Sequence, residues 1–151
     1  MIYLLDTDHL SEFVKESVSG TRLKRKLQTL DEIHSAATSI VSFEEMMRGW
    51  LAEIHGTLNA RSQVPLYHQL FRVFEAFDDW DVLKWTNESA DVYVGLVRQR
   101  LRVKTMDLKN AAIAIQNDAT LLSRNLKDFV RVPGLVVEVW LSCSIPSSHG
   151  V

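Results

Sequence analysis

Acidic and amide side chains stand at four junctions between the structural elements that the sequence predicts. The first junction follows an apolar run at residues 2–5, and the second lies in the first turn of an amphipathic helix. The third precedes another helix, and the fourth follows the apolar residues 119–123. These junctions carry Asp6, Glu45, Asp107, and Asn125 or Asp128. The carboxyl ends of parallel strands lie at one edge of a sheet, so we expect these side chains to meet there.

A divalent cation is the partner that such a cluster of acids predicts. Three carboxylates within a few ångströms repel one another unless a proton or a cation compensates their charge. Oxygen ligands with no His or Cys at matching positions suit Mg²⁺ or Mn²⁺ and argue against zinc. The five histidines show no pairing at i, i+4, and we expect them on the surface or in packing roles. The sequence has no glycine-rich phosphate loop and no Gly-x-Ser-x-Gly motif.

Each acid taken alone also has an ordinary explanation as helix-end chemistry. Ser42 and Glu45 form a Ser-x-x-Glu pattern that is typical of a capping box. Asp107 and Asp8 could each be an N-cap whose charge complements a helix dipole. The apolar periodicity favours Glu44 over Glu45 for partial burial. Spacing therefore leaves the cap and the metal-site interpretations open.

A basic series on alternate positions runs directly towards Asp107. It consists of Arg98, Arg100, Arg102 and Lys104. Such a series is typical either of a solvated helix end or of phosphate contacts.

The elements that would position these residues alternate between strand and helix patterns. Strands are predicted at 2–5, 33–39, 80–85, 119–123 and 135–139, and helices at 9–14, around 23–30, at 43–54, 65–77, 87–101 and 108–117, with a short turn at 126–129. This alternation predicts an α/β fold with a parallel sheet. The helices at 43–54 and 65–77 form a predicted hairpin, whose large apolar side chains exceed what one packing face can bury. These side chains are Met46, Met47, Trp50, Phe71, Phe74 and Phe77.

Composition bounds the class of protein. The chain has 151 residues, of which 46% are hydrophobic, which suits one domain with one sizeable core. A net charge of -2 means that a nucleic acid would have to be met by a local basic patch or through metal ions. Cys143 is the only cysteine, which excludes an intrachain disulfide and favours a reducing compartment. No run of residues has the length of a membrane span, so we expect a soluble, cytoplasmic protein.

Four motifs in order resemble a known family. LLDTDHLSEF, TSIVSFEEMMRG, MDLKNAAIA and LLSRNLKDFVRVPGL are similar to the PIN domain of VapC-type toxins, the ribonuclease components of toxin–antitoxin pairs. The resemblance covers residues 1–140, and we expect 141–151 to be a disordered tail. It implies a three-layer α/β/α sandwich with a central parallel sheet of about four to five strands. It also implies an endoribonuclease that depends on Mg²⁺ or Mn²⁺, a homodimer, and a small cognate antitoxin that lies across the site.

The resemblance also assigns roles to residues of this chain. The implied metal ligands are Asp6, Glu45 and Asp107, because Glu45 stands four residues before Gly49 as the family pattern requires. The implied supporting hydroxyl groups are those of Thr7, Ser42 and Ser123, and the implied RNA contacts are Arg102, Lys104 and Arg124. Two positions depart from the pattern. Asn110 replaces an apolar residue, and Asn125 stands where several members have an aspartate, so that Asn125 or Asp128 completes the site and one or two metal ions are possible.

These assignments predict hydrolysis of RNA phosphodiester bonds by a metal-activated water. Two alternatives remain open at this point. One is a DNA or flap nuclease on the same fold. The other is a catalytically degenerate module that retains only its antitoxin-binding surface.

Overall fold

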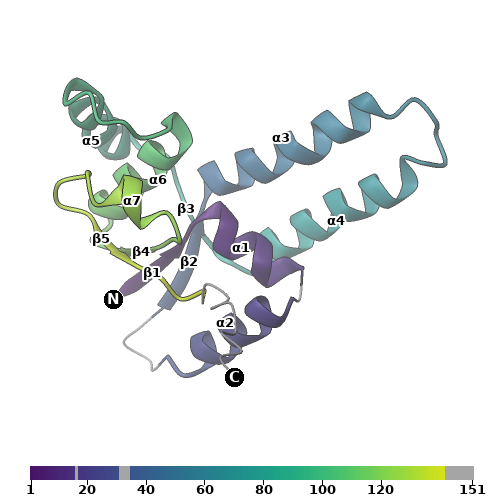
Figure 1. The fold of residues 1–151 in the computed structure, drawn as a ribbon, viewed down its shortest axis with the longest axis horizontal. Helices are drawn as coiled ribbons and strands as arrows, with labels where there is room; N and C mark the ends of the chain where they lie inside the picture. The colour runs from purple at the N-terminus through teal and green to yellow at the C-terminus, as the bar shows by residue number, and fades with distance from the viewer. Residues whose placement is uncertain (16, 31–34, 142–151) are drawn as a thin grey trace, which may run out of the picture.

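A five-stranded parallel sheet forms the centre of the molecule, as the alternating pattern predicts. The computed structural model describes residues 1–15, 17–30 and 35–141 (Figure 1). The strands, in the sheet order β3-β2-β1-β4-β5, are β1 (Ile2–Leu5), β2 (Ser35–Ser39), β3 (Asp81–Leu83), β4 (Thr120–Leu122) and β5 (Val136–Glu138). The part of the second predicted strand at 33–34 and the predicted disordered tail from residue 142 onwards, with Cys143, lie outside the described residues.

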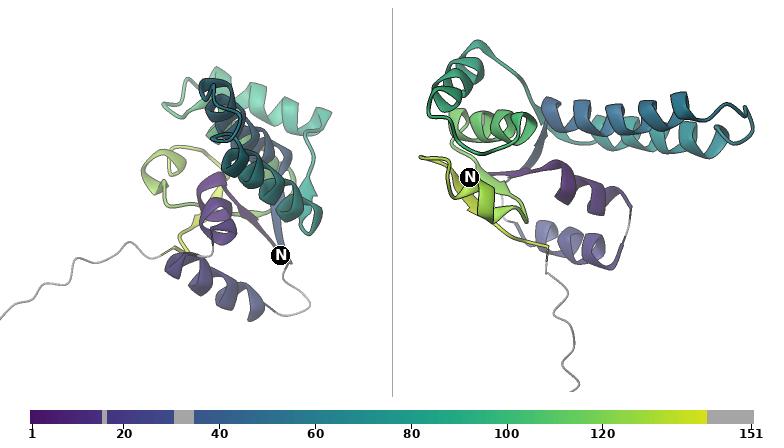
Figure 2. Two further views of the ribbon diagram at one scale, coloured as in Figure 1. Left: turned by 90° about the vertical axis from the view of Figure 1, so that its right-hand side faces the viewer. Right: turned by 45° about the horizontal axis from the view of Figure 1, so that its top comes forward.

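Helices follow most of the strands and cover both faces of the sheet (Figures 1 and 2). They are α1 (Thr7–Val14), α2 (Val18–Gln28), α3 (Ile40–Gly56), α4 (Val64–Asp78), α5 (Asn87–Arg98), α6 (Thr105–Gln116) and α7 (Leu126–Phe129). No helix among the described residues has the length and hydropathy needed to cross a membrane.

The two central strands show why the fold has three layers. Successive side chains of a strand point to opposite faces. Leu4 of β1 and Leu121 of β4 pack with α5 and α6 on one face, and their neighbours Leu5 and Leu122 pack with α1 and α2 on the other. All four leucines are fully buried, and burial of one such side chain contributes about 1.5–3 kcal/mol. A strand that is apolar at every position is therefore covered on both sides, and the α/β/α sandwich is confirmed.

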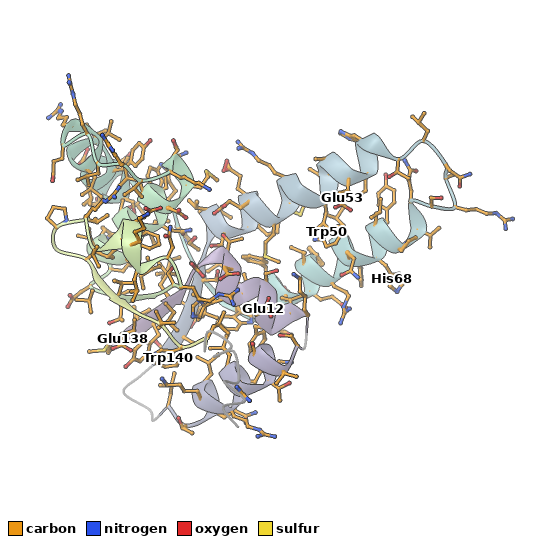
Figure 3. The ribbon with its side chains drawn as sticks, viewed as in Figure 1. Glu12, Trp50, Glu53, His68, Glu138 and Trp140 are labelled. Carbon is orange, nitrogen blue, oxygen red and sulfur yellow. The ribbon has the colours of Figure 1, made fainter. Side chains whose placement is uncertain are left out.

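The helical hairpin of α3 and α4 extends away from the body of the molecule (Figures 1 and 2). At its base the rings of Phe43 and Phe77 meet edge to face, with centroids 4.9 Å apart. Trp50 is half-buried and faces α4 (Figure 3). Phe71 and Phe74 expose 59% and 60% of their surface. Phe71 and Phe74 are therefore exposed as the sequence predicts, whereas Phe77 belongs to the core.

Several helix starts differ from the sequence prediction. α3 begins at Ile40 with Ser39 as its N-cap, whose hydroxyl accepts from the Ser42 backbone N–H at 3.0 Å. The capping-box interpretation of Ser42 and Glu45, one of the two left open by the sequence, is therefore wrong. α6 begins at Thr105, so Asp107 lies in its first turn and is not the N-cap. The apolar pattern shows where a helix packs on the core, and the N-cap residues Ser39 and Lys104 lie outside that pattern.

The N-cap of α1 and the last residue of α5 also differ from the sequence prediction. Asp6, not Asp8, is the N-cap of α1. The helix predicted at 87–101 ends at Arg98, and Arg100 adopts a left-handed backbone conformation with φ 52°. A non-glycine residue in that conformation stops a helix, which separates the basic series into a helix end and a loop.

Candidate active site

One pocket collects most of the predicted site residues at the carboxyl edge of the sheet. It has a volume of about 560 Å³ and is lined by Asp6, Thr7, Asp8, Ser11, Glu45, Asp107, Arg124 and Asn125. The lining comes from α1 and its N-cap, the second turn of α3, the first turn of α6 and the loop after β4. Residues from four distant segments thus meet at one place, as the parallel topology requires.

Asp6 occupies the point where β1 ends and α1 begins. Its Oδ1 atom accepts from the backbone N–H of His9 at 2.8 Å and lies 3.1 Å from His9 Nδ1. The other ring nitrogen, Nε2, accepts from the backbone N–H of Trp140 at 3.4 Å. These partners favour the tautomer with the proton on Nδ1, directed at Asp6. His9 is fully buried.

The role of His9 is one that sequence reasoning missed. We expected a surface or packing histidine, and the structure places it against a predicted metal ligand. The available signal was its position three residues after an N-cap, where a side chain can reach back to the cap.

Glu45 reaches the pocket from the first part of α3. Its Oε1 atom accepts a 2.8 Å hydrogen bond from the hydroxyl group of Thr7. Thr7 Oγ1 also lies 3.2 Å from Ser42 Oγ, but a threonine has one hydroxyl proton, and the charged carboxylate is the stronger acceptor. Glu44 points elsewhere and pairs with Arg48 at 3.4 Å. Glu45 and not Glu44 therefore lines the pocket, but both side chains are partly buried, so the periodicity, which favoured Glu44 for partial burial, does not distinguish them.

Asn110 explains one of the two departures from the family pattern. It is buried, its carbonyl oxygen accepts from the Ser39 hydroxyl group, and its Nδ2 donates to Ser42 Oγ at 3.4 Å. Ser39 caps α3, and Ser42 lies next to Thr7. The amide thus joins α6 to the start of α3 through a satisfied buried network, which holds Glu45 in place.

Asn125 connects the remaining acids. Its Nδ2 donates to Asp128 Oδ2 at 2.9 Å and lies 3.5 Å from Asp107 Oδ2, and its backbone N–H donates to Ser123 Oγ at 3.0 Å. Asn125 lines the pocket, and Asp128 contacts the site through it. Both candidates for the fourth position are therefore near Asp107.

Of the three predicted basic RNA contacts, only Arg124 lines the pocket. It forms a two-point ion pair with Asp8, with distances of 2.6 Å from Nε to Oδ2 and 2.7 Å from Nη2 to Oδ1. This pair lowers the pKa of Asp8 and raises that of Arg124. Arg102 and Lys104 are exposed outside the pocket lining. The charge of Lys104 nevertheless acts on Asp107, whose pKa it lowers in part.

The carboxylates of the pocket destabilise one another's charge. Burial, followed by the charges of Asp107 and Asp6, raises the pKa of Glu45 above its usual value, although the hydrogen bond from Thr7 acts in the opposite direction. Burial, followed by the charge of Asp6, likewise raises the pKa of Asp107. Carboxylates in this condition favour a bound cation.

Two overlapping sets of side chains are candidates to hold that cation. Ligand atoms of Asp6, Asp8 and His9 lie within 4.8 Å of one another. In that set, however, His9 is hydrogen-bonded to Asp6 and the charge of Asp8 is matched by Arg124. Burial is the main cause of the raised pKa values of Glu45 and Asp107, and the charge of Asp6 adds to it in both. The second candidate set, Asp6, Glu45 and Asp107, lines the same pocket and consists of carboxylate donors only, the ligand type that a hard divalent cation takes.

Solved structures with the same fold include chains of VapBC toxin–antitoxin systems. A chain of VapBC2 from Rickettsia felis, bound to a DNA fragment from its promoter, matches with a TM-score of 0.71 and 21% identity, covering 93% of this chain and 99% of that one. A chain of VapBC-1 from nontypeable Haemophilus influenzae matches with a TM-score of 0.73 and 20% identity, covering 94% and 100%. FitAcB from Neisseria gonorrhoeae gives a TM-score of 0.66 at 20% identity, covering 95% and 100%.

Comparison of the amino-acid sequence with family models identifies the family of this chain. No curated protein sequence matches the chain significantly. The family model described as the PIN domain matches residues 3–135, a range that contains β1 from its second residue onwards and all of β2, β3 and β4, and that ends directly before β5. The chain therefore belongs to the PIN domain family.

Proposed function

We propose that this protein is a metal-dependent endoribonuclease and the toxin component of a toxin–antitoxin pair. The observation that carries the proposal is the convergence of Asp6, Glu45 and Asp107 in one pocket, where burial and mutual repulsion raise the pKa values of Glu45 and Asp107. Membership of the PIN domain family supports a nuclease activity. The fold shared with VapBC chains supports the toxin role.

In the proposed mechanism, Asp6, Glu45 and Asp107 hold Mg²⁺ or Mn²⁺. When bound, the cation supplies a water of lowered pKa and offsets negative charge on the scissile phosphate. The hydroxyl of Thr7 keeps the carboxylate of Glu45 directed into the pocket. The Ser39–Asn110–Ser42 network fixes the turn of α3 that carries Glu45. Asn125 holds Asp107 and Asp128 on the opposite side.

Arg124 is the residue best placed to meet the RNA backbone beside the acids. Its guanidinium group lines the pocket, and Asp8 holds it in a fixed orientation. A planar guanidinium group binds phosphate oxygens through paired hydrogen bonds. Asp8 accepts one hydrogen bond from Nε and one from Nη2 of Arg124. The other N–H groups of the guanidinium remain for a phosphate.

The hairpin of α3 and α4 supplies the surface that we assign to the antitoxin. Its apolar groove has a volume of about 320 Å³ and is lined by Phe43, Met47, Tyr67, Leu70, Phe71 and Phe74. The solved neighbours include VapBC complexes, and an exposed apolar groove of this kind is typical of a protein contact. We also propose that the protein forms a homodimer, because the resemblance to VapC-type PIN domains implies one.

The test is cleavage of a single-stranded RNA and of a DNA of the same sequence by the purified protein, with Mg²⁺, with Mn²⁺ and with EDTA. We expect RNA cleavage that requires the metal and is lost in Asp107→Asn. Glu53→Gln is a matched control, because Glu53 is an exposed acid on α3 far from the pocket (Figure 3). Cleavage of DNA alone would favour the flap-nuclease alternative, and the absence of any cleavage would favour a degenerate binding module.

A further inference from the structure

A second hollow lies on the same edge of the sheet as the acid pocket. It has a volume of about 200 Å³ and is lined by Ile40, Val41, Glu44, Trp85 and Lys109. Ile40 directly follows β2, and Trp85 lies just beyond β3. The acid pocket is built over the ends of β1, β2 and β4. The sheet order β3-β2-β1-β4 therefore places the two hollows side by side along one edge.

Aromatic rings and one ammonium group give this hollow its chemistry. Trp85 exposes 37% of its surface and meets Tyr93 edge to face, with ring centroids 5.7 Å apart. Lys109 Nζ lies 5.6 Å from the Trp85 centroid and 6.0 Å from that of Tyr93. Among the described residues, no carboxylate forms an ion pair with Lys109. Its ammonium group therefore keeps hydrogen-bonding capacity for a ligand.

The same two helices line both hollows. α3 contributes Glu45 to the acid pocket and Glu44 to the second hollow, and α6 contributes Asp107 and Lys109 in the same way. Two residues along a helix advance by about 3 Å but turn by about 200°, so Asp107 and Lys109 lie on different faces of α6, and the helix, about 10 Å across, separates the two hollows. A single strand that enters the acid pocket therefore passes over the starts of α3 and α6 to reach Trp85, a path of a few nucleotides at about 3.4 Å or more per nucleotide.

We propose that Trp85 and Lys109 form a subsite for one nucleobase of the single-stranded RNA and its adjoining phosphate, a few nucleotides from the scissile bond. Trp85 stacks on the base, and Lys109 moves from the rings to the phosphate. This inference rests on the proposed nuclease function and assigns the part of the substrate that the acids do not hold. An aromatic platform beside a cation is the usual way in which proteins hold single strands.

The charge of Glu44 and the size of the hollow are both compatible with a bound nucleotide. Glu44 would repel a phosphate, but Arg48 lies 3.4 Å from its carboxylate and offsets that charge. The hollow is small and partly polar, which suits one planar ring with a charged group beside it. The apolar groove of the hairpin is where a protein segment finds more surface. A protein side chain seated on Trp85 is the alternative that the experiment must exclude.

The first experiment measures binding separately from cleavage. A fluorescein-labelled, unstructured RNA is titrated by anisotropy with Asp107→Asn protein, which keeps the RNA intact. We expect Trp85→Leu in this background to weaken binding about fivefold to a hundredfold, the range for the loss of one stacked base. Trp85→Phe keeps a ring and should restore most of the affinity. The matched control is Trp80→Leu, because Trp80 precedes β3 as Trp85 follows it and also meets a ring edge to face, that of Phe13.

The second measurement separates the base from the phosphate. Lys109→Gln should reduce the slope of log K against log salt concentration by about 0.7, the value for one phosphate contact on a single strand. Trp85→Leu should leave this slope unchanged. Lys109→Arg should restore it. Lys26→Gln is the control, because Lys26 Nζ lies over the ring of Trp140, 4.2 Å from its centroid, away from both hollows.

An RNA with one abasic position identifies the stacked base. At that position the penalty of Trp85→Leu should vanish, because the partner of the ring is already absent. If Trp85→Leu and Lys109→Gln leave RNA affinity and salt slope unchanged while the wild type cleaves RNA, the subsite is wrong and the proposed function stands. The subsite is equally wrong if Trp85→Leu weakens only antitoxin binding. A wild type that neither binds nor cleaves RNA overturns both.

Discussion

The hydroxyl group of Thr7 donates a 2.8 Å hydrogen bond to Glu45, a residue 38 positions further along the chain. Thr7 is the first residue of α1, and Glu45 lies in the second turn of α3. The bond therefore joins the starts of two helices that follow neighbouring strands, β1 and β2. It also partly offsets the raised pKa of Glu45, since the donor favours the charged carboxylate.

Loss of this donor should weaken metal binding. We expect Thr7→Val to reduce Mn²⁺ affinity by about tenfold to a hundredfold, as the loss of a group that orients a ligand does. Thr7→Ser retains the hydroxyl and should bind nearly as the wild type does. Isothermal calorimetry of the three proteins is the measurement. Equal affinity in Thr7→Val would mean that the carboxylate of Glu45 needs no partner, or that it is not a ligand.

Replacement of Asp6 by asparagine should abolish RNA cleavage without loss of the fold. Asparagine caps a helix about as well as aspartate, so the bond from the His9 backbone N–H to the cap is kept. The substitution removes the negative charge with which Asp6 would bind the cation. Thermal unfolding and RNA cleavage are measured on the same preparation. A variant that cleaves at the wild-type rate would remove Asp6 from the site.

The metal-free protein should lose stability as the pH rises. The pKa values of Glu45 and Asp107 are raised from 4.5 and 3.8, so the folded state binds protons more tightly than the unfolded chain does. The resulting stability is fully present below those ordinary values and is lost as the pH rises through the folded values. Asp8 has a lowered pKa, and its contribution, present above its ordinary value of 3.8, is lost as the pH falls through the folded value.

We therefore expect the melting temperature in EDTA to fall as the pH is raised from about 4 towards neutrality. The fall should be smaller in Glu45→Gln, which carries no titrating group at this position. Scanning calorimetry across this pH range is the measurement. A melting temperature that rises over the same range in the wild type and not in the variant would contradict the sign of the effect.

Divalent metal should reverse this loss of stability. A ligand that binds only the folded state stabilises it by about 2.7 kcal/mol at a hundredfold excess over its dissociation constant. Both Mg²⁺ and Mn²⁺ should raise the melting temperature at pH 7, and Asp107→Asn should show a smaller shift. The absence of any shift with either ion, or a shift and activity with Zn²⁺ alone, would contradict the oxygen-ligand site.

The exposed rings of the hairpin should affect the antitoxin and not the chemistry. Phe74 exposes 60% of its surface on α4, so Phe74→Ala should leave the fold and metal-dependent cleavage intact. We expect it to weaken the complex with the cognate antitoxin by roughly 2 kcal/mol, as anchor residues of interfaces do. Surface plasmon resonance gives the affinity. If Phe74→Ala unfolds the protein, the ring belongs to the core.

The sequence predicts the sheet well because each buried strand is a short run of apolar residues, which can be recognised from neighbouring residues alone. The apolar runs around Leu4 and Leu121 require cover on both faces, and the structure provides it. The predicted acids meet for the same reason, since each lies at the end or start of an element that packs on the core. Helix starts are less predictable, because the capping residues Asp6 and Ser39 lie at strand ends, where the apolar pattern does not reach.

The residues that sequence reasoning missed depend on partners far along the chain. Asn110 bonds to Ser39 across 71 positions, and His9 bonds to Trp140 across 131. No spacing within one element indicates such a pair. A polar residue at an expected apolar position was the only signal for Asn110. It marks a place where two elements share a hydrogen bond rather than a packing contact.

The order of the strands also bears on when the site can exist during synthesis. β1 lies between β2 and β4, and Tyr3 pairs with Thr120. Long-range pairing of this kind is slow to form, and a chain that leaves the ribosome from its N-terminus cannot complete it before β4 has emerged. Asn125, which lines the pocket, follows β4. A prematurely terminated product that ends between α6 and β4 carries Asp6, Glu45 and Asp107 but lacks the Arg124 and Asn125 side of the pocket.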